Sequence, residues 1–474
     1  MGEERDWMYE SDEVLETIRR YEDMMKKKAR YFFDVHEFEE IIDYYMDIND
    51  FSKAVFAAEY GYRMHPSSTA IQLKIAHLLI DKGKMAESIG ILDRLEKLEE
   101  SNYEVYILKG SAYNAMGKLS EAQRHFDKAI SLTIDDNRDE VLYNIGMSFE
   151  HLNHFNTAIK YFLQAYQVNP ENPSVLYDLA YCYERVNQPE KSIQFYDKYL
   201  DEDPFCENAW FNIGTIYNKV LNDDKALEAY DFAIAINPDY SSAYYNKANI
   251  LSNLERYDLA LIEYLEFLRI EPEHIMAHCY IGECYEKTQQ YDQALAYFEK
   301  ALTYDPECAD ALFGKGVVMM HLERYSESEE LIKHALEINE DNTEYLYALG
   351  LVYMRQENYN EAVREFKQVV ELEPLDYEAW LNYSEMLYDL GRTAEAIEIL
   401  HRACDYNFNN AFINIRLASY LFVSNDMRQG YLFLDRALAC NTTCVNELYE
   451  YFPEASNDKF IKAILEKHLN QNPE

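Results

Sequence analysis

Residues Glu207–Pro238 read ENAWFNIGTIYNKVLNDDKALEAYDFAIAINP, and this stretch decides the fold. The small residues Gly214 and Ala226 each stand at a fixed place in one of two successive helical segments. Small residues at such places let two helical backbones approach closely. Pro238 stops the second segment, because proline lacks an amide hydrogen and restricts the residue before it. The stretch therefore predicts a tight helical hairpin.

The same pattern recurs along the chain with a period of 34 residues, as the spacing of Pro170, Pro204, Pro238, Pro272 and Pro306 indicates. Pro66 and Pro374 fit the same period once an insertion at Asn137 and Arg138 is allowed. The period predicts twelve units over residues 35–444. They begin at Val35, Thr69, Tyr103, Asp139, Pro173, Glu207, Ser241, Ile275, Ala309, Thr343, Tyr377 and Ala411.

Three positions within the unit carry the packing signal. Position 8 is small in every unit except the first, where it is Ile42, and position 20 is small in all units. Position 11 is always bulky, as at Tyr183 and Tyr217. We expect the bulky residues to fill the space between neighbouring hairpins.

The two ends of the chain are predicted to be caps. In the expected N-terminal capping helix, within residues 1–34, Val14, Ile18, Tyr21 and Met25 share one face. Residues 445–474 are expected to form C-terminal capping helices, with Ile461, Ile464, Leu465 and Leu469 facing the last unit. Such caps cover the open apolar sides of a stack of repeats.

The pattern resembles the tetratricopeptide repeat (TPR). The residues that carry the resemblance are Trp210, Ile213, Gly214, Tyr217, Ala226, Tyr230, Ala233 and Pro238. The resemblance implies an all-α fold, a right-handed superhelical solenoid whose function is to bind other proteins.

The charge of the chain restricts its partners. It has 86 acidic and 44 basic side chains, a formal net charge of −42. Such a charge repels nucleic acid and speeds encounter with a basic partner. The acidity could equally serve only to keep a large solenoid soluble.

The sequence also suggests a location. Residues 1–12 are polar and acidic and do not resemble a secretory signal. No apolar stretch approaches the roughly 20 residues that cross a bilayer. We therefore expect a cytoplasmic protein without membrane insertion.

The chain offers no catalytic motif, and we expect neither a catalytic residue nor a cofactor. His274, His278, Cys279, Cys284 and Cys308 contain metal-ligand types, but their spacing is not that of a zinc site. Cys206, Cys308 and Cys444 share position 34, and Cys182 and Cys284 share position 10. We interpret both positions as places for a small apolar side chain and predict no metal site.

The resemblance to the TPR family also implies where a ligand binds. In that family, positions 2, 5, 6, 9, 12 and 13 of the first helices line the concave face. Asparagine recurs at position 6, where its amide could grip a peptide backbone. The acids Glu150 and Glu283 fall on the same face. The candidate peptide-binding residues are Asn144, Tyr177, Asp178, Tyr181, Phe211, Asn212, Thr215, Tyr245, Asn246, Asn249 and Glu283.

These observations favour a non-enzymatic scaffold or adaptor. It would bind an extended, basic or neutral segment of another protein along the concave face between about residues 140 and 290. Two alternatives stay open. The first is a structural subunit that self-associates or assembles through convex or terminal surfaces. The second is an enzyme whose site lies hidden between repeats.

Overall fold

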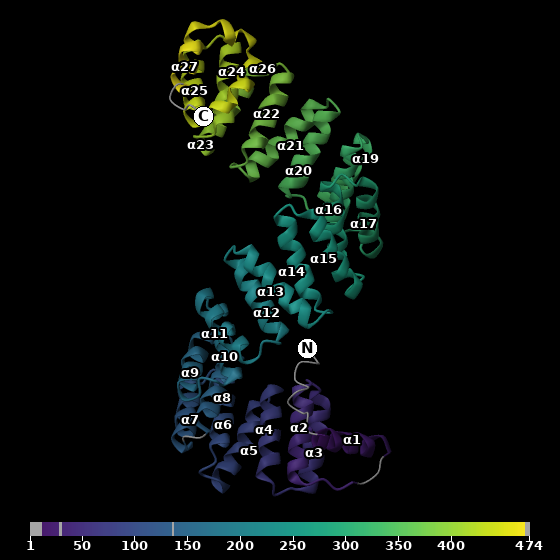
Figure 1. Cartoon of the computed structure of the whole chain (residues 1–474), viewed down its shortest axis with the longest axis vertical. Coiled ribbons are helices and arrows are strands. Elements are labelled where there is room, and N and C mark those ends of the chain that lie inside the picture. The colour runs from purple at the N-terminus through teal and green to yellow at the C-terminus, as the bar shows by residue number, and fades with distance from the viewer. Residues whose placement is uncertain (1–11, 28–30, 135–136, 470–474) are drawn as a thin grey trace. The chain divides into compact units, whose positions relative to one another are not determined.

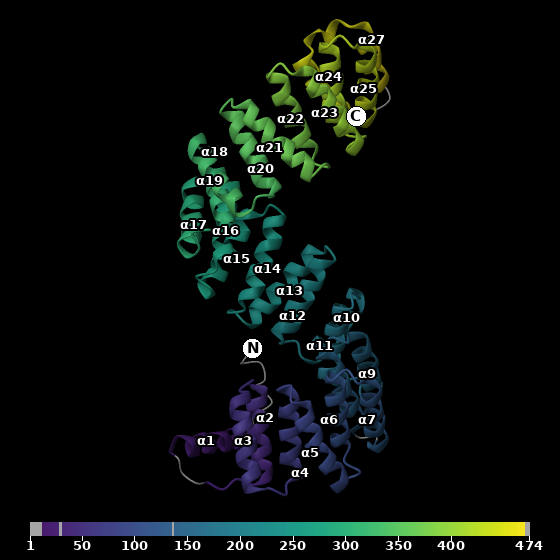
Figure 2. The ribbon, with the colours of Figure 1, turned by 180° about the vertical axis from the view of Figure 1, so that it is seen from behind.

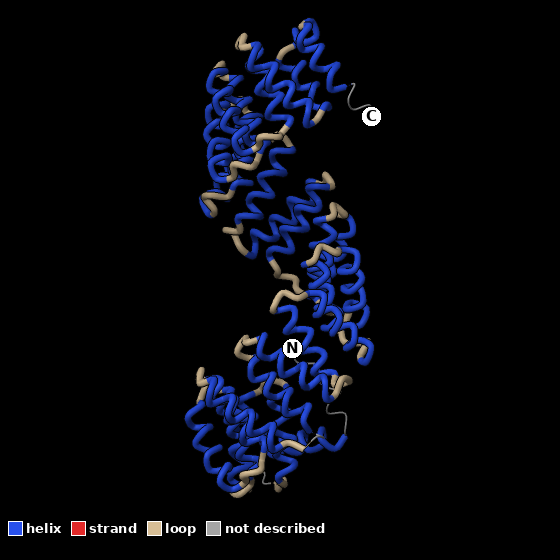
Figure 3. The backbone as a smooth tube through the Cα atoms, turned by 90° about the vertical axis from the view of Figure 1, so that its left-hand side faces the viewer, coloured by secondary structure: helices blue, strands red, loops and turns tan. Residues whose placement is uncertain are grey.

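The computed structural model describes residues 12–27, 31–134 and 137–469 of the chain. Every regular element in these residues is a helix, and none is a strand (Figure 3). The chain divides into two compact units, unit 1 at Met1–Pro238 and unit 2 at Asp239–Glu474.

In unit 1 a single helix, α1, precedes six pairs (Figure 1). The helices of unit 1 are α1 (Asp12–Lys27), α2 (Val35–Asp47), α3 (Phe51–Met64), α4 (Thr69–Asp81), α5 (Met85–Leu98), α6 (Tyr103–Ala115), α7 (Leu119–Leu132), α8 (Arg138–Glu150), α9 (Phe155–Val168), α10 (Pro173–Arg185), α11 (Pro189–Glu202), α12 (Glu207–Lys219) and α13 (Asp223–Ile236).

In unit 2 six further pairs are followed by two short 3-10 helices and two α-helices (Figure 2). The helices of unit 2 are α14 (Ser241–Asn253), α15 (Tyr257–Ile270), α16 (Ile275–Lys287), α17 (Tyr291–Tyr304), α18 (Ala309–His321), α19 (Tyr325–Ile338), α20 (Thr343–Arg355), α21 (Tyr359–Leu372), α22 (Tyr377–Asp389), α23 (Thr393–Tyr406), α24 (Ala411–Val423), α25 (Met427–Cys440), η3 (Thr442–Cys444), α26 (Val445–Tyr451), η4 (Pro453–Asn457) and α27 (Lys459–Leu469).

The turn inside each helix pair depends on one residue with left-handed backbone geometry. This residue is at position 15 of the period in every pair: Asn49, Gly83, Gly117, Asn153, Asn187, Leu221, Glu255, Gln289, Glu323, Glu357, Gly391 and Asn425. Their φ angles lie between 56° and 74°. Glycine and asparagine adopt this geometry readily, whereas a leucine does so at a cost. The turn is therefore imposed by the packing of the pair even where the residue does not favour it.

Position 34 of the period is the N-cap of the next first helix. The side chains of Ser68, Asn102 and Asn172 each accept a hydrogen bond from a backbone amide of that helix's first turn. Position 34 thus favours a capping oxygen, and our interpretation of it as a place for a small apolar residue was wrong. Cys206 and Cys308 occupy the N-caps of α12 and α18 and make no side-chain capping bond there.

The second helices end at position 30 with or without a proline. α13 ends at Ile236, two residues before Pro238, but α5 and α19 end at the same position and are followed by Glu100 and Glu340 where the proline would stand. The end of the helix is therefore set by the packing of the pair, and proline reinforces it.

The close approach of the two helices in a pair depends on positions 8 and 24. A Cβ atom added to Gly110 would lie 2.3 Å from the ring of Phe126, and one added to Gly146 would lie 2.4 Å from the ring of Phe162. The same contact joins Gly214 to Tyr230, Gly282 to Phe298 and Gly350 to Phe366. In each case the aromatic ring of the second helix lies directly on the backbone of the first helix.

The helix α1 covers one end of unit 1, and α27 covers one end of unit 2. α1 packs against α2 and buries Ile18, Tyr21 and Met24. Met25, which we expected on this face, is 42% exposed, because the buried stripe follows Thr17, Ile18, Tyr21 and Met24. At the other end α27 packs against α25 and buries Ile461 and Leu465. The parts of the expected caps at residues 1–11, 28–30 and 470–474 lie outside the described residues.

Replacing Gly110 by alanine is expected to destabilise unit 1 by about 1–3 kcal/mol, since the new methyl group would overlap the Phe126 ring. Gly90, in the interior of α5, has open space around its Cβ position and serves as the matched control. Gly90→Ala should instead stabilise the chain by about 1 kcal/mol through helix propensity. Urea unfolding followed by circular dichroism measures both, and effects of the same sign would contradict this account.

Candidate functional site

The first helices of neighbouring pairs contact one another directly. In unit 1 the contacts join α2 to α4, α4 to α6 and α6 to α8, and in unit 2 they join α16 to α18, α18 to α20 and α22 to α24. In the described part of the chain no pair of second helices is in contact to this extent. These pairs therefore approach one another most closely on the side of their first helices. We call the surface that the first helices of each unit form the inner face.

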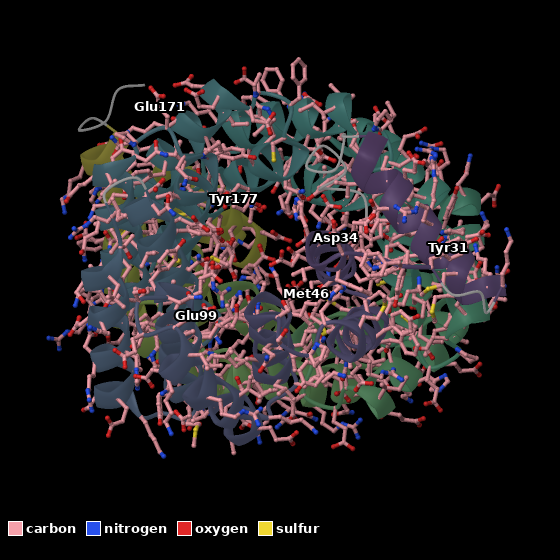
Figure 4. The ribbon with its side chains drawn as sticks, turned by 90° about the horizontal axis from the view of Figure 1, so that it is seen from below. Tyr31, Asp34, Met46, Glu99, Glu171 and Tyr177 are labelled. Carbon is pink, nitrogen blue, oxygen red and sulfur yellow. The ribbon has the colours of Figure 1, made fainter. Side chains whose placement is uncertain are left out.

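Seven of the candidate residues lie on three first helices of unit 1, and all seven are half-buried. The list is Asn144 on α8, Tyr177, Asp178 and Tyr181 on α10, and Phe211, Asn212 and Thr215 on α12. In Figure 4, Tyr177 lies on the inner side of the helices of unit 1. Glu171, in the turn before α10, lies at their edge.

A row of hydrogen bonds connects these helices. The Tyr143 hydroxyl donates to Asp178 at 2.8 Å, and the Asn212 amide donates to the Tyr177 hydroxyl at 3.0 Å. In unit 2 the Asn382 amide donates in the same way to the Tyr347 hydroxyl at 2.8 Å. Each bond joins position 5 of one pair to position 6 of the next, 35 residues later. We call this series the hydroxyl ladder.

The ladder changes what the predicted asparagines can do. The Asn212 amide nitrogen donates to the hydroxyls of both Tyr177 and Tyr196, each at 3.0 Å. The Thr215 hydroxyl contacts the Phe211 carbonyl and the Tyr230 hydroxyl. An amide group has only two N–H donors, so those of Asn212 serve the protein itself. The sequence analysis did not predict the hydroxyl ladder. The pattern that indicates it is a tyrosine at position 5 with an asparagine or aspartate 35 residues later.

The other candidates lie in unit 2. Tyr245, Asn246 and Asn249 are half-buried on α14, and Asn249 accepts a hydrogen bond from the Tyr264 hydroxyl at 2.6 Å. The Tyr245 ring packs against Phe267 and Tyr280, with centroids 5.0 and 6.1 Å away. These aromatic rings are therefore held by one another.

Glu283 on α16 reaches solvent with part of its side chain, although the surrounding protein desolvates its carboxyl group, and it makes no ion pair within the described residues. Its pKa is raised to about 7, first by desolvation and then by the carboxylates of Asp310 on α18 and Glu344 on α20. Like charges raise a carboxyl pKa because each opposes the ionisation of the others. Three successive first helices thus direct acids toward one region of the inner face of unit 2.

Glu150 on α8 provides a similar group in unit 1. It is half-buried, its pKa is raised to about 7 by desolvation and by Asp178, and it accepts a hydrogen bond from the Cys182 thiol at 3.4 Å. Glu184 on α10, by contrast, is paired with Lys219 at 2.5 Å. Glu150 has no cationic partner in the described part of unit 1.

The histidine and cysteine cluster of α16 has a structural role. A ring nitrogen of His278 contacts the Pro272 carbonyl at 2.9 Å, as the indole nitrogens of Trp210 and Trp380 do with Pro204 and Pro374 at 3.0 Å. His278 thus holds the turn that enters its helix. The sulfur atoms of Cys279 and Cys308 are both buried and lie 3.8 Å apart.

Comparison with protein-family models matches the tetratricopeptide repeat at residues 103–133, 152–212, 207–240, 229–262, 285–351 and 347–410. Together the matches cover more than half of the chain. The chain belongs to the tetratricopeptide repeat family, and its fold is an all-α TPR solenoid. Members of this family are generally non-enzymatic, and the chain is, in this general sense, a scaffold for protein interaction.

Several solved structures are similar to the chain. MamA is 26% identical, with 37% of this chain and 95% of MamA covered and a TM-score of 0.35. YrrB, described as a TPR protein with an unusual peptide-binding site, is 28% identical to the chain. The match covers 38% of this chain and 93% of YrrB, with a TM-score of 0.31. A tetratricopeptide repeat protein from Parabacteroides merdae is 19% identical to the chain. The match covers 53% of this chain and 99% of that protein, with a TM-score of 0.36. No curated protein matches the chain.

Among the described residues, no helix combines the length and the apolar character needed to cross a bilayer.

Replacing Tyr177 by phenylalanine is expected to lower the stability of unit 1 by about 0.5–1.5 kcal/mol, because it removes one bond of the hydroxyl ladder. Tyr181, one helical turn later, packs against Phe155 and makes no side-chain hydrogen bond within the described residues, so Tyr181→Phe is the control. Chemical denaturation should show a loss for Tyr177→Phe only. Equal losses would mean that the ladder does not stabilise the stack.

Proposed function

We propose that the chain is an adaptor that binds an extended, basic or neutral segment of another protein on the inner face. Each unit offers its own binding surface: a segment would lie over α8, α10 and α12 in unit 1, or over α14, α16 and α18 in unit 2. One observation carries the proposal: Glu283, Asp310 and Glu344 lie near one another on α16, α18 and α20 and make no ion pair within the described residues. A cationic side chain bound there would relieve the mutual repulsion of the acids.

The aromatic and amide groups beside these acids would contribute shape and polar contacts. Tyr177, Tyr181 and Phe211 are each half-buried, so a bound chain could pack on their exposed edges. The Asn212 side chain would offer its carbonyl oxygen to a backbone N–H, since its donors already serve Tyr177 and Tyr196. The inner face would thus hold a peptide backbone while the acids select its charge.

A fluorescently labelled peptide of alternating lysine and serine serves as the probe, with an alternating glutamate and serine peptide as its counterpart. The lysine peptide is expected to bind at low salt and to be released as salt rises, because surface charges are screened over a distance of about 10 Å at 0.1 M. The glutamate peptide should not bind. Fluorescence anisotropy measures both.

Reversing one charge locates the site. Glu283→Lys and Glu150→Lys are each expected to weaken binding of the lysine peptide by roughly tenfold. Glu330 is exposed on the second helix α19 and makes no ion pair in the described residues, so Glu330→Lys makes the same change in net charge away from the inner face. A loss equal to that of Glu283→Lys would show attraction by overall charge alone and would contradict the proposal.

Binding of the lysine peptide is expected to depend on pH. The pKa of Glu283 and that of Glu150 are both raised to about 7, so these groups gain charge between pH 6 and pH 8 while the peptide lysines stay protonated. Only the ionised carboxylate attracts the lysine, so affinity should rise by a few fold from pH 6 to pH 8. The increase should shrink in Glu283→Gln. An affinity that falls or stays level over this range would count against the acids as the recognition groups.

A further inference from the structure

The outer surface of α15 is unusual for a second helix of unit 2. Leu259, Ile262 and Leu265 are 41%, 55% and 39% exposed. The opposite side of the same helix is buried through Ala260, Tyr264 and Phe267. The helix is therefore apolar on both sides, whereas a surface helix normally keeps a polar outer face.

The packing of the repeat does not require these three residues. The equivalent positions are Gln293, Ala296 and Glu299 in α17 and Glu327, Glu330 and Lys333 in α19, all of them exposed. Polar, charged or small side chains thus occupy all three positions in α17 and α19. A contiguous exposed apolar face that the fold does not need is a sign of a contact surface.

The charges at the two ends of this face indicate what covers it. Asp258, Ile262, Leu265 and Arg269 follow the spacing of a single helix face, with the acid at one end and the base at the other. Asp258 and Arg269 are both exposed, and Arg269 also pairs with Asp239 at 2.8 Å and with Glu266 at 2.9 Å in its own chain, so a second copy's Asp258 would join or replace these carboxylates. A second copy of α15 can lie antiparallel on this face, related to the first by a twofold axis at the level midway between Glu263 and Tyr264. Asp258 then lies opposite Arg269 of the other copy, and Ile262 lies opposite Leu265. Arg256 and Glu271, both exposed, also fall opposite each other.

We propose that a second copy of this chain docks antiparallel on the outer face of α15, defined as Asp258, Leu259, Ile262, Leu265 and Arg269. About this axis Asp258 and Ile262 are complementary to Arg269 and Leu265 of the second copy, as a twofold interface requires, and Leu259 flanks these four residues. A single helix pair covers less than the roughly 1,000 Å² of a stable interface, so the dimer is weak, with a dissociation constant on the order of micromolar or higher. Salt strengthens it by screening the repulsion between two chains of net charge −42. This dependence is opposite to that of peptide binding on the inner face.

Sedimentation velocity over a range of protein concentrations tests the proposal. The wild-type chain is expected to shift from its monomer mass of 56.0 kDa toward twice that value as concentration rises. Ile262→Glu is expected to weaken the dimer at least tenfold. Leu432, 53% exposed at the equivalent position of α25, provides the control, and Leu432→Glu should leave association unchanged.

Two results would overturn the proposal. One is a monomer at every concentration in high salt, which would mean that no second copy covers α15. The other is a dimer that Ile262→Glu and Leu432→Glu weaken equally, which would place the interface elsewhere or reflect a general loss of folding. Circular dichroism of both variants separates these last two causes.

Charge exchange tests the antiparallel register. Asp258→Arg and Arg269→Asp should each weaken the dimer several fold, and the double variant should restore it to within about twofold of the wild type. Arg269 also pairs with Asp239 and Glu266 of its own chain, so helix content is compared for all three variants. A double variant no tighter than the weaker single variant would contradict the proposed register.

Discussion

The contact between a small residue at position 8 and a ring or branched side chain at position 24 sets the distance between the two helices of a pair. Phe126, Phe162 and Phe298 are fully buried because each lies on the backbone of a glycine in the facing helix. The ring fills the volume that a Cβ would occupy and excludes water from both helices. Because this contact recurs in successive pairs, one pair can stack on the next, and a hydrophobic core extends over several pairs in each unit.

Other local features follow from this packing and do not determine it. The turn at position 15 has left-handed geometry even at Leu221, which is 87% exposed and gains nothing from burial there. α12 and α18 begin at position 1 of the repeat, as most of the first helices do, although their N-cap residue is a cysteine that makes no side-chain capping bond. Such residues carry a small local cost that the neighbouring apolar contacts offset. The repeat therefore tolerates unfavourable residues at its turns but not at the contact between its helices.

The helical repeat and its family were readable from the sequence because small and bulky residues recur at fixed positions over the whole chain. One detail failed because cysteine serves two purposes. Cysteine at position 34 suggested packing, and only the structure shows that this position caps a helix. A ligand contact at Asn212 stays a prediction, and the structure adds that its two donors bind Tyr177 and Tyr196. Whether a polar side chain contacts a neighbouring helix or solvent depends on the residue 35 positions earlier, on the preceding first helix. A periodic pattern alone does not show this.

The hydroxyl ladder also bears on how such a chain can lengthen or shorten. Its bonds join one pair to the next at a separation of 35 residues, as from Tyr143 to Asp178 and from Tyr177 to Asn212. If a whole pair were lost by recombination, the tyrosine on one side would meet a position-6 residue from the following pair, and Tyr143 would then face Asn212. The hydrogen bond would re-form with new partners. Genetic gain or loss of entire 34-residue modules can thus occur without repairing the junction, whereas partial modules would break it.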